Sequence, residues 1–181
     1  IAPCDSGDSG MTSEASKPSW FYWLTGGIMI FLLTLLDQGS KLLAVTYLKN
    51  KDDIILLPGV LQLKYLENRG MAFGMFEGKI PVFVILCFVF LGVFIYVYRR
   101  IPKTSYYLPL TVTSLFMVSG AVGNCIDRVF RGYVVDFFYF SLINFPVFNV
   151  ADIFVVCSGI SLVLLVCFKY KDDNDYQFLR R

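Results

Sequence analysis

Residues 81–98, PVFVILCFVFLGVFIYVY, decide the fold class, because no side chain in this run carries a charge. An apolar helix of about 20 residues matches the thickness of the hydrocarbon core of a bilayer, so the run predicts a transmembrane helix. Three more apolar stretches, at 20–45, 106–126 and 150–168, have comparable length. We therefore expect an all-α membrane protein with four transmembrane helices.

The composition agrees with a membrane protein and removes several classes of chemistry. Of the 181 residues, 56% are hydrophobic and 17% are charged, whereas soluble proteins average about 25% charged residues. The absence of histidine excludes Ser-His-Asp and Cys-His catalysis and zinc sites of the HExxH type. The five cysteines are widely spaced and are interpreted as small buried hydrophobic residues, not as a disulfide framework. We expect no metal and no cofactor, and a net charge of +2 without a basic block predicts no nucleic-acid partner.

One membrane domain is expected over residues 20–168, and the segments on either side of it differ in composition. Residues 1–19 are polar and are expected to be disordered. Within them, residues 1–10 precede the first methionine, Met11, and are interpreted as a vector-derived remnant. Residues 169–181 are expected to form a cytoplasmic tail.

Positive charge predicts the orientation in the membrane. The short link RRIPKTS, residues 99–105, carries Arg99, Arg100 and Lys103, and the C-terminal tail is also rich in lysine and arginine. Loops rich in these residues stay in the cytoplasm. Because the predicted number of spans is even, both termini are then expected to be cytoplasmic.

Two segments on the opposite, outer side are apolar without being long enough to span. Residues 54–76 are broken by proline and glycine, and within them VLQLKYLEN, residues 60–68, alternates apolar and polar side chains as a half-buried strand does. We expect a small extracytoplasmic β-sheet here, lying at the membrane surface. Residues 129–149 are rich in aromatic rings, which favour the headgroup level, and within them the aromatic stretch 137–148 is expected to form an interfacial loop.

Two polar clusters lie in the first half of the chain. In DQGSK, residues 37–41, Asp37 and Lys41 are four residues apart and share one helix face, which is typical of a structural ion pair. In NRGMAF, residues 68–73, Asn68 is followed by Gly70, which indicates either a turn or a close approach of the backbone. Polar groups within membrane segments are also candidates for function.

A third cluster, GNCIDR at residues 123–128, brings Asn124, Asp127 and Arg128 within about one helical turn. A guanidinium near the interface can bind a lipid phosphate or a peptide carbonyl. Alternatively, Asp127 anchors the end of the helix, with no role in binding.

The fourth cluster contains Asp136 in VVDF and Asp152 in FNVAD. Asp152 has a structural explanation, because Asn149 can cap the helix and an acid three residues later meets the positive end of its dipole. Asp136 has no such explanation, since it stands between Val135 and Phe137. Two carboxylates close together at low dielectric share a proton, as in aspartic proteases, where one activates water and the other polarises the scissile carbonyl. Spacing alone does not establish that Asp136 and Asp152 meet.

Taken together, these motifs resemble the lipoprotein signal peptidase (signal peptidase II) family of bacterial membrane aspartic peptidases. DQGSK, NRGMAF, GNCIDR, VVDF and FNVAD occur in the family's order between residues 37 and 152. The resemblance implies four membrane helices with an outer β-cradle, in the bacterial cytoplasmic (inner) membrane. It also implies an active site near the outer leaflet that cleaves prolipoproteins just before a diacylglyceryl-modified cysteine. One departure, Ser119 where the family often has glycine, leaves close helix packing at 119–121 open.

The resemblance also implies roles for single residues. The catalytic aspartates would be Asp136 and Asp152. The residues that would line the substrate site are Asn68, Gly70, Asn124, Arg128 and Asn149, and the supporting residues would be Asp37, Lys41 and Asp127. The implied partners are the prolipoprotein, membrane lipids and globomycin-type cyclic peptide inhibitors.

Two other functions compete with the peptidase. In a small proton- or ion-coupled transporter, the intramembrane acids and bases would form a relay, although no inverted repeat is visible. In a scaffold without catalytic activity, the polar groups would join the helices and Asp→Asn changes would be tolerated. Proton-dependent uptake into liposomes would identify the transporter.

Overall fold

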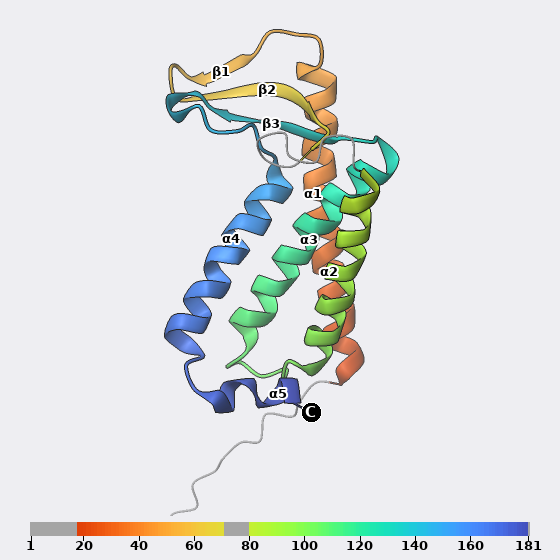
Figure 1. The fold of residues 1–181 in the computed structure, drawn as a ribbon, viewed down its shortest axis with the longest axis vertical. Helices are drawn as coiled ribbons and strands as arrows, with labels where there is room; N and C mark the ends of the chain where they lie inside the picture. The colour runs from red at the N-terminus through yellow and green to blue at the C-terminus, as the bar shows by residue number, and fades with distance from the viewer. Residues whose placement is uncertain (1–17, 71–79, 181) are drawn as a thin grey trace, which may run out of the picture.

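The computed structural model describes residues 18–70 and 80–180, and its main feature is a bundle of four long helices (Figure 1). They are α1 (Ser19–Leu48), α2 (Ile80–Arg100), α3 (Leu108–Phe130) and α4 (Val150–Leu164), and α4 continues as a π-helical turn over Leu165–Lys169. All four are long and apolar enough to cross a membrane, which confirms the predicted spans. The predictions for residues 1–17, including the vector-derived remnant, and for residues 71–76 lie outside the described residues.

A three-stranded antiparallel sheet covers one end of the bundle (Figure 1). Its order is β1 (Ile54–Leu57), β2 (Leu61–Asn68) and β3 (Val134–Phe140), and the first two strands lie in the segment predicted to form a sheet. The prediction of an interfacial loop over residues 137–148 was wrong for residues 137–140, because β3 covers residues 134–140. That stretch, VVDFFYF, consists mainly of β-branched and aromatic residues, which favour strands, and it pairs with β2 along its length.

Helix α3 lies at the centre of the bundle and contacts the other three long helices. Two glycines allow this close packing, because a Cβ at Gly120 would collide with the carbonyl oxygen of Ala151, and a Cβ at Gly123 with the carboxylate of Asp37. Ser119 is fully buried, and its hydroxyl donates to the carbonyl oxygen of Leu115 at 2.7 Å within the same helix. The serine therefore does not prevent close packing of α3.

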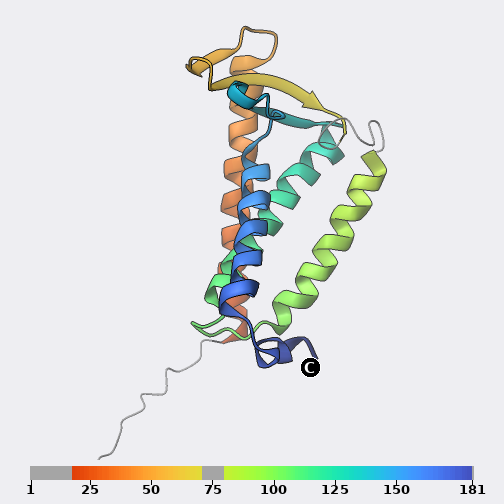
Figure 2. The same ribbon diagram turned by 60° about the vertical axis from the view of Figure 1, so that its left-hand side comes forward.

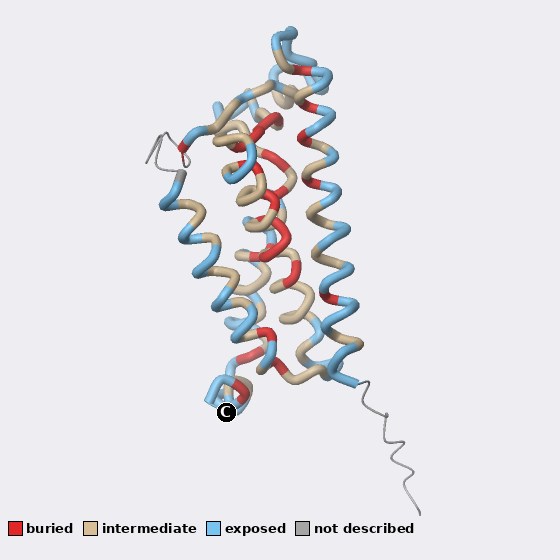
Figure 3. The backbone as a smooth tube through the Cα atoms, turned by 90° about the vertical axis from the view of Figure 1, so that its right-hand side faces the viewer, coloured by how far each residue is buried: buried red, intermediate tan, exposed pale blue. Residues whose placement is uncertain are grey.

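The surface of the bundle is apolar, and the buried residues face inward. Leu32, Leu35, Phe88 and Val89 are among the many exposed hydrophobic side chains, as expected where the solvent is lipid. Buried positions gather on the facing sides of the helices and beneath the sheet (Figure 3). Helices α2 and α4 stand on opposite sides of α3 (Figure 1, Figure 2).

The residues after α4 fold back across the end of the bundle that lies away from the sheet. They form a 3₁₀ turn (Asp173–Tyr176) and a short helix, α5 (Gln177–Arg180). Phe178 is buried there against the ring of Tyr107, with 5.5 Å between the ring centroids. The first residues of α1 lie at this same end (Figure 1).

Candidate active site

All ten residues singled out from the sequence lie in one polar network under the sheet. They come from separate elements: α1 carries Asp37 and Lys41, α3 carries Asn124, Asp127 and Arg128, β2 ends at Asn68 with Gly70 just beyond it, β3 carries Asp136, and the start of α4 carries Asn149 and Asp152. The sheet and the helix ends thus bring together groups that are more than 100 residues apart in sequence.

Asp136 and Asp152 are joined through a single asparagine. The side-chain amide of Asn149 donates to Oδ1 of Asp136 at 2.6 Å, and its backbone N–H donates to Oδ2 of Asp152 at 3.1 Å. Asn149 is the N-cap of α4, and its Oδ1 accepts from the backbone N–H of Asp152 at 3.0 Å. The predicted cap is confirmed, and the same residue also reaches the second carboxylate.

Asp136 is held in place from both sides. Its side chain is 1% exposed, and Asn68 Nδ2 donates to Oδ2 at 2.8 Å while Asn149 occupies Oδ1. Burial, and then the charge of Asp152, raise the pKa of Asp136 to about 7, well above the ordinary 3.8 of an aspartate. Asp136 can therefore hold a proton near neutral pH.

Lys41 forms the centre of the network beneath this pair. It is 0% exposed, and Nζ lies 2.9 Å from Oδ2 of Asp37, 2.9 Å from Oδ2 of Asp127 and 2.9 Å from Oδ1 of Asn124. An ammonium group has three N–H donors, and here all three have acceptors. The ion pair predicted between Asp37 and Lys41 is confirmed, and it extends to α3.

Asn124 carries the network from Lys41 to Asp152. Its Oδ1 accepts from Lys41 and also from Asn149 Nδ2 at 3.1 Å. Its Nδ2 donates to Oδ1 of Asp152 at 2.8 Å. Both oxygens of Asp152 thus accept N–H donors, one from Asn124 and one from the backbone of Asn149.

Asp127 lies on the far side of Lys41 and does not line the groove described below. Its oxygens accept from Arg131 at 2.8 Å and from the backbone N–H of Val135 at 3.2 Å, in addition to Lys41. The carboxylate therefore ties α3 to α1 and to β3. Arg131 was not singled out from the sequence, although it follows Asp127 by four residues, which is the spacing of an ion pair on a helix.

Arg128 points toward the groove from the end of α3. It donates to the carbonyl oxygens of Asn124 at 3.2 Å and Gly70 at 3.4 Å, and its guanidinium lies 4.7 Å from the centroid of the Phe83 ring on α2. Gly70 in turn donates its backbone N–H to Oδ1 of Asn68 at 3.0 Å. These contacts bring the backbone of Gly70 close to a charged side chain, as one of the two sequence interpretations expected.

A groove of about 1030 Å³ opens between the sheet and the adjacent ends of α2, α3 and α4. Asp136, Asp152 and Arg128 line its polar side. The remaining lining residues include an apolar set. Phe145 and Phe148 come from the aromatic stretch that the sequence singled out, whereas Phe83, Ile153, Val156 and Cys157 were not singled out. Residues 152, 153, 156 and 157 are spaced so that they share one face of α4. This spacing could have indicated from the sequence that they line a common surface.

The described residues contain no group of three or more acidic or cysteine side chains arranged to hold a metal ion. The groove brings together the carboxyl groups of Asp136 and Asp152, the guanidinium of Arg128 and the amide of Asn68.

Comparison with known proteins agrees with this geometry. Residues 29–168 match the family described as signal peptidase (SPase) II. The lipoprotein signal peptidase of Caldanaerobacter subterraneus is 41% identical over 143 residues, covering 78% of this chain and 95% of that protein. The lipoprotein signal peptidase of Clostridium novyi is 37% identical over 142 residues, covering 77% and 95%.

A solved structure described as a bacterial membrane enzyme has the same fold. It superimposes with a TM-score of 0.71 at 30% sequence identity, covering 82% of this chain and 92% of that one. The family match over most of the chain decides against the transporter and the scaffold. The chain belongs to the signal peptidase II family of bacterial membrane proteases, which process the signal peptides of lipoproteins.

Proposed function

We propose that this protein is an aspartic endopeptidase that cuts prolipoproteins immediately before a diacylglyceryl-modified cysteine. The observation that carries the proposal is the link through Asn149, which joins the carboxylates of Asp136 and Asp152 in one groove. Two carboxyl groups in this arrangement can share one proton and act on a water molecule.

The surroundings of the two carboxyl groups suggest different roles. Asp136 holds the proton near neutral pH and donates it as a hydrogen bond to the scissile carbonyl oxygen. Asp152, whose oxygens accept from Asn124 and Asn149, takes a proton from the attacking water. The water oxygen bonds to the carbonyl carbon, and the carbonyl oxygen takes the proton of Asp136. When the C–N bond breaks, the proton held by Asp152 passes to the cysteine nitrogen, and a proton of the intermediate returns to Asp136.

The remaining site residues are proposed to hold the substrate. Arg128 and the backbone of Gly70 lie where they can bind peptide carbonyls and amides, and Asn68 keeps Asp136 in position. The apolar wall of Ile153 and Val156 suits acyl chains that remain in the bilayer. Globomycin-type cyclic peptides are expected to occupy the same groove. Asp37, Lys41 and Asp127 support the site without contacting substrate.

We also propose that the sheet end faces outward and that both termini are cytoplasmic. This orientation is supported by the basic residues at the opposite end, among them Arg99, Arg100 and Lys103. It brings the groove to the outer surface of the membrane, where a translocated prolipoprotein presents its cleavage site.

The test is the release of signal peptide from a diacylglyceryl-modified prolipoprotein by purified protein in lipid. Wild type should cleave, and Asp136→Asn and Asp152→Asn should each lose activity by about 1000-fold or more, because each removes a group that moves a proton. Thermal unfolding of each variant checks that it is folded.

Asp127→Asn is the matched control, since Asp127 is equally buried but does not line the groove. We expect it to keep measurable activity. A folded Asp136→Asn protein with wild-type activity would remove Asp136 from the mechanism, and an inactive wild type would overturn the proposed substrate.

A further inference from the structure

The end of the bundle away from the sheet carries an excess of positive charge, because six basic residues stand there against three described aspartates, Asp172, Asp173 and Asp175. The five salt bridges among residues 18–70 and 80–180 involve Lys41, Lys49, Arg69 and Arg131, all at the sheet end. The basic residues at the other end pair with no carboxylate within 4.0 Å in the described parts of the chain: Arg99, Arg100, Lys103, Lys169, Lys171 and Arg180. Unneutralised charge at the end of a membrane helix attracts an anion.

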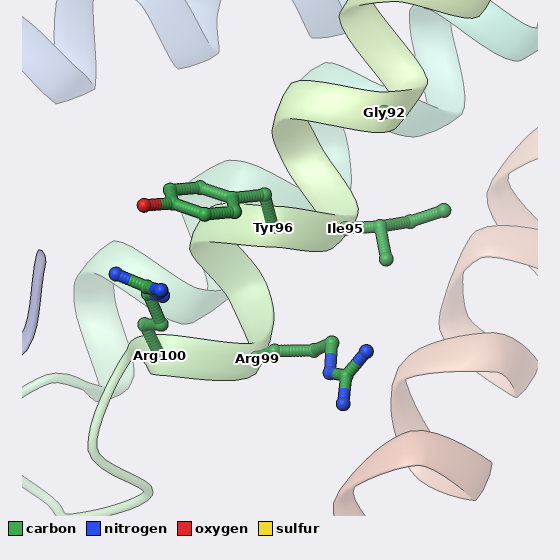
Figure 4. Close-up of a pocket in the computed structure, with 5 residues that line it drawn as sticks. All are labelled: Gly92, Ile95, Tyr96, Arg99 and Arg100. Carbon is green, nitrogen blue, oxygen red and sulfur yellow. The ribbon is translucent and has the colours of Figure 1, made fainter. Parts of the chain in front are cut away.

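One face of α2 at this end forms a pocket of about 570 Å³. Its residues are Gly92, Ile95, Tyr96, Arg99 and Arg100, which we call the α2 strip. Tyr96 and Arg100 form one side of the strip, and Ile95 and Arg99 form the other (Figure 4). Gly92 lies at the end of the strip toward the middle of α2. The strip is thus cationic where the helix ends and apolar toward its middle.

Arg100 is held in position before any ligand binds. Its Nη1 donates to the carbonyl oxygen of Leu179 at 2.8 Å, and its guanidinium stacks 4.2 Å from the centroid of the Tyr96 ring. Neither partner is charged, so the full positive charge of Arg100 remains. Arg99 points to the other side of the strip (Figure 4) and makes no hydrogen bond or ion pair with a described residue.

We propose that the α2 strip binds an anionic glycerophospholipid of the surrounding leaflet. The phosphate would bind the free guanidinium of Arg99, which lies on the same side of the strip as Ile95, and Arg100 across the strip would add its positive charge (Figure 4). An acyl chain would run along Ile95 to Gly92, where a Cβ would meet nothing within 4 Å and the surface is open. Because the cationic end continues into an apolar one, a lipid fits better than a free phosphate ion.

The experiment is native mass spectrometry of the full-length protein in micelles that contain equal amounts of phosphatidylglycerol and phosphatidylcholine with identical chains. Wild type should retain phosphatidylglycerol in preference. The double variant Arg99→Gln, Arg100→Gln should reduce that preference by about 10-fold or more, because it removes the charge-assisted contacts that the guanidinium groups make with the phosphate. The control Lys171→Gln, Arg180→Gln removes the same charge at the same end, outside the strip, and should leave the preference unchanged.

Gly92→Leu tests the apolar half of the strip without a change in charge. It should lower the retention of phosphatidylglycerol, because leucine fills the space over which the chain lies, and excess glycerol 3-phosphate should not displace the lipid. Equal retention of both lipids by wild type would overturn the proposal, and so would an equal loss in the Lys171, Arg180 control. The assignment of a lipid would be overturned if Gly92→Leu retained phosphatidylglycerol as well as wild type does and glycerol 3-phosphate displaced it. Since no cleavage is measured, these outcomes do not depend on the proposed peptidase activity.

Discussion

Nζ of Lys41 lies 2.9 Å from the side-chain oxygen of Asn124, and this contact determines which way the Asn124 amide faces. A lysine ammonium has only donors, so it requires the oxygen of the amide. The NH₂ group is then directed at Asp152, to which it donates at 2.8 Å. A fully buried lysine on α1 therefore controls the donor that reaches one of the proposed catalytic groups on α4.

Lys41→Gln is expected to destabilise the protein by about 3 kcal/mol or more, because two buried carboxylates lose their shared counter-charge. Thermal unfolding in detergent measures the loss. The double variant Asp37→Asn, Lys41→Gln removes one charge of each sign, and its amide oxygen can still accept from the backbone of Ala151. We expect the double variant to unfold at a higher temperature than Lys41→Gln, and a lower temperature would contradict this account.

Asn124→Ala should reduce kcat/KM by about 10- to 100-fold, the effect of one hydrogen bond to a charged group. The variant removes the side-chain donor to Asp152 and leaves both aspartates in place. Asn174→Ala is the control, because within the described parts of the chain the Asn174 side chain bonds only to Gln177, at the opposite end of the molecule from the site. Wild-type kinetics in Asn124→Ala would show that the donor has no role in catalysis.

Asp136→Asn is expected to raise the unfolding temperature more at pH 8 than at pH 4. The pKa of Asp136 is about 7 in the folded protein and near 3.8 when unfolded, so the folded state binds the proton more tightly. Wild type therefore loses stability as pH rises from about 4 to 7, and the loss is constant above 7. Asparagine does not titrate, so the variant escapes this loss.

The measurement is the unfolding temperature of both proteins between pH 4 and pH 8.5. The difference between variant and wild type should grow up to about pH 7 and then level off. A difference that is independent of pH would show that Asp136 titrates normally in the folded protein.

Gly120→Ala should destabilise the bundle by about 1–3 kcal/mol, the usual effect of overpacking, because the new methyl group would meet the backbone of Ala151. Gly159→Ala on α4 is the matched control, since a Cβ there meets nothing within 4 Å. The control should be neutral or slightly stabilised, because alanine favours the helix. Equal unfolding temperatures for both variants would rule out close packing at Gly120.

The sequence singled out the residues that meet in the polar network, but it did not predict which contacts they make. Asp37 and Lys41, or Asn149 and Asp152, are three or four residues apart, so helical spacing alone brings each pair together. The meeting of Asp136 with Asn149 is different, because it depends on how β3 docks on the start of α4. No local pattern reports that contact.

The sequence by itself determined the four membrane helices, the cap of α4 and the identity of the polar groups, since hydropathy, capping and helical periodicity are local properties. Tertiary structure decided that residues 134–140 form a strand, because a strand is stable only when a partner accepts its hydrogen bonds, and here that partner is β2. It also decided the closeness of α3 to α1 and α4, which depends on the space left by Gly120 and Gly123. The buried contacts of Lys41 follow from that closeness, and with them the direction of the donors that reach Asp152.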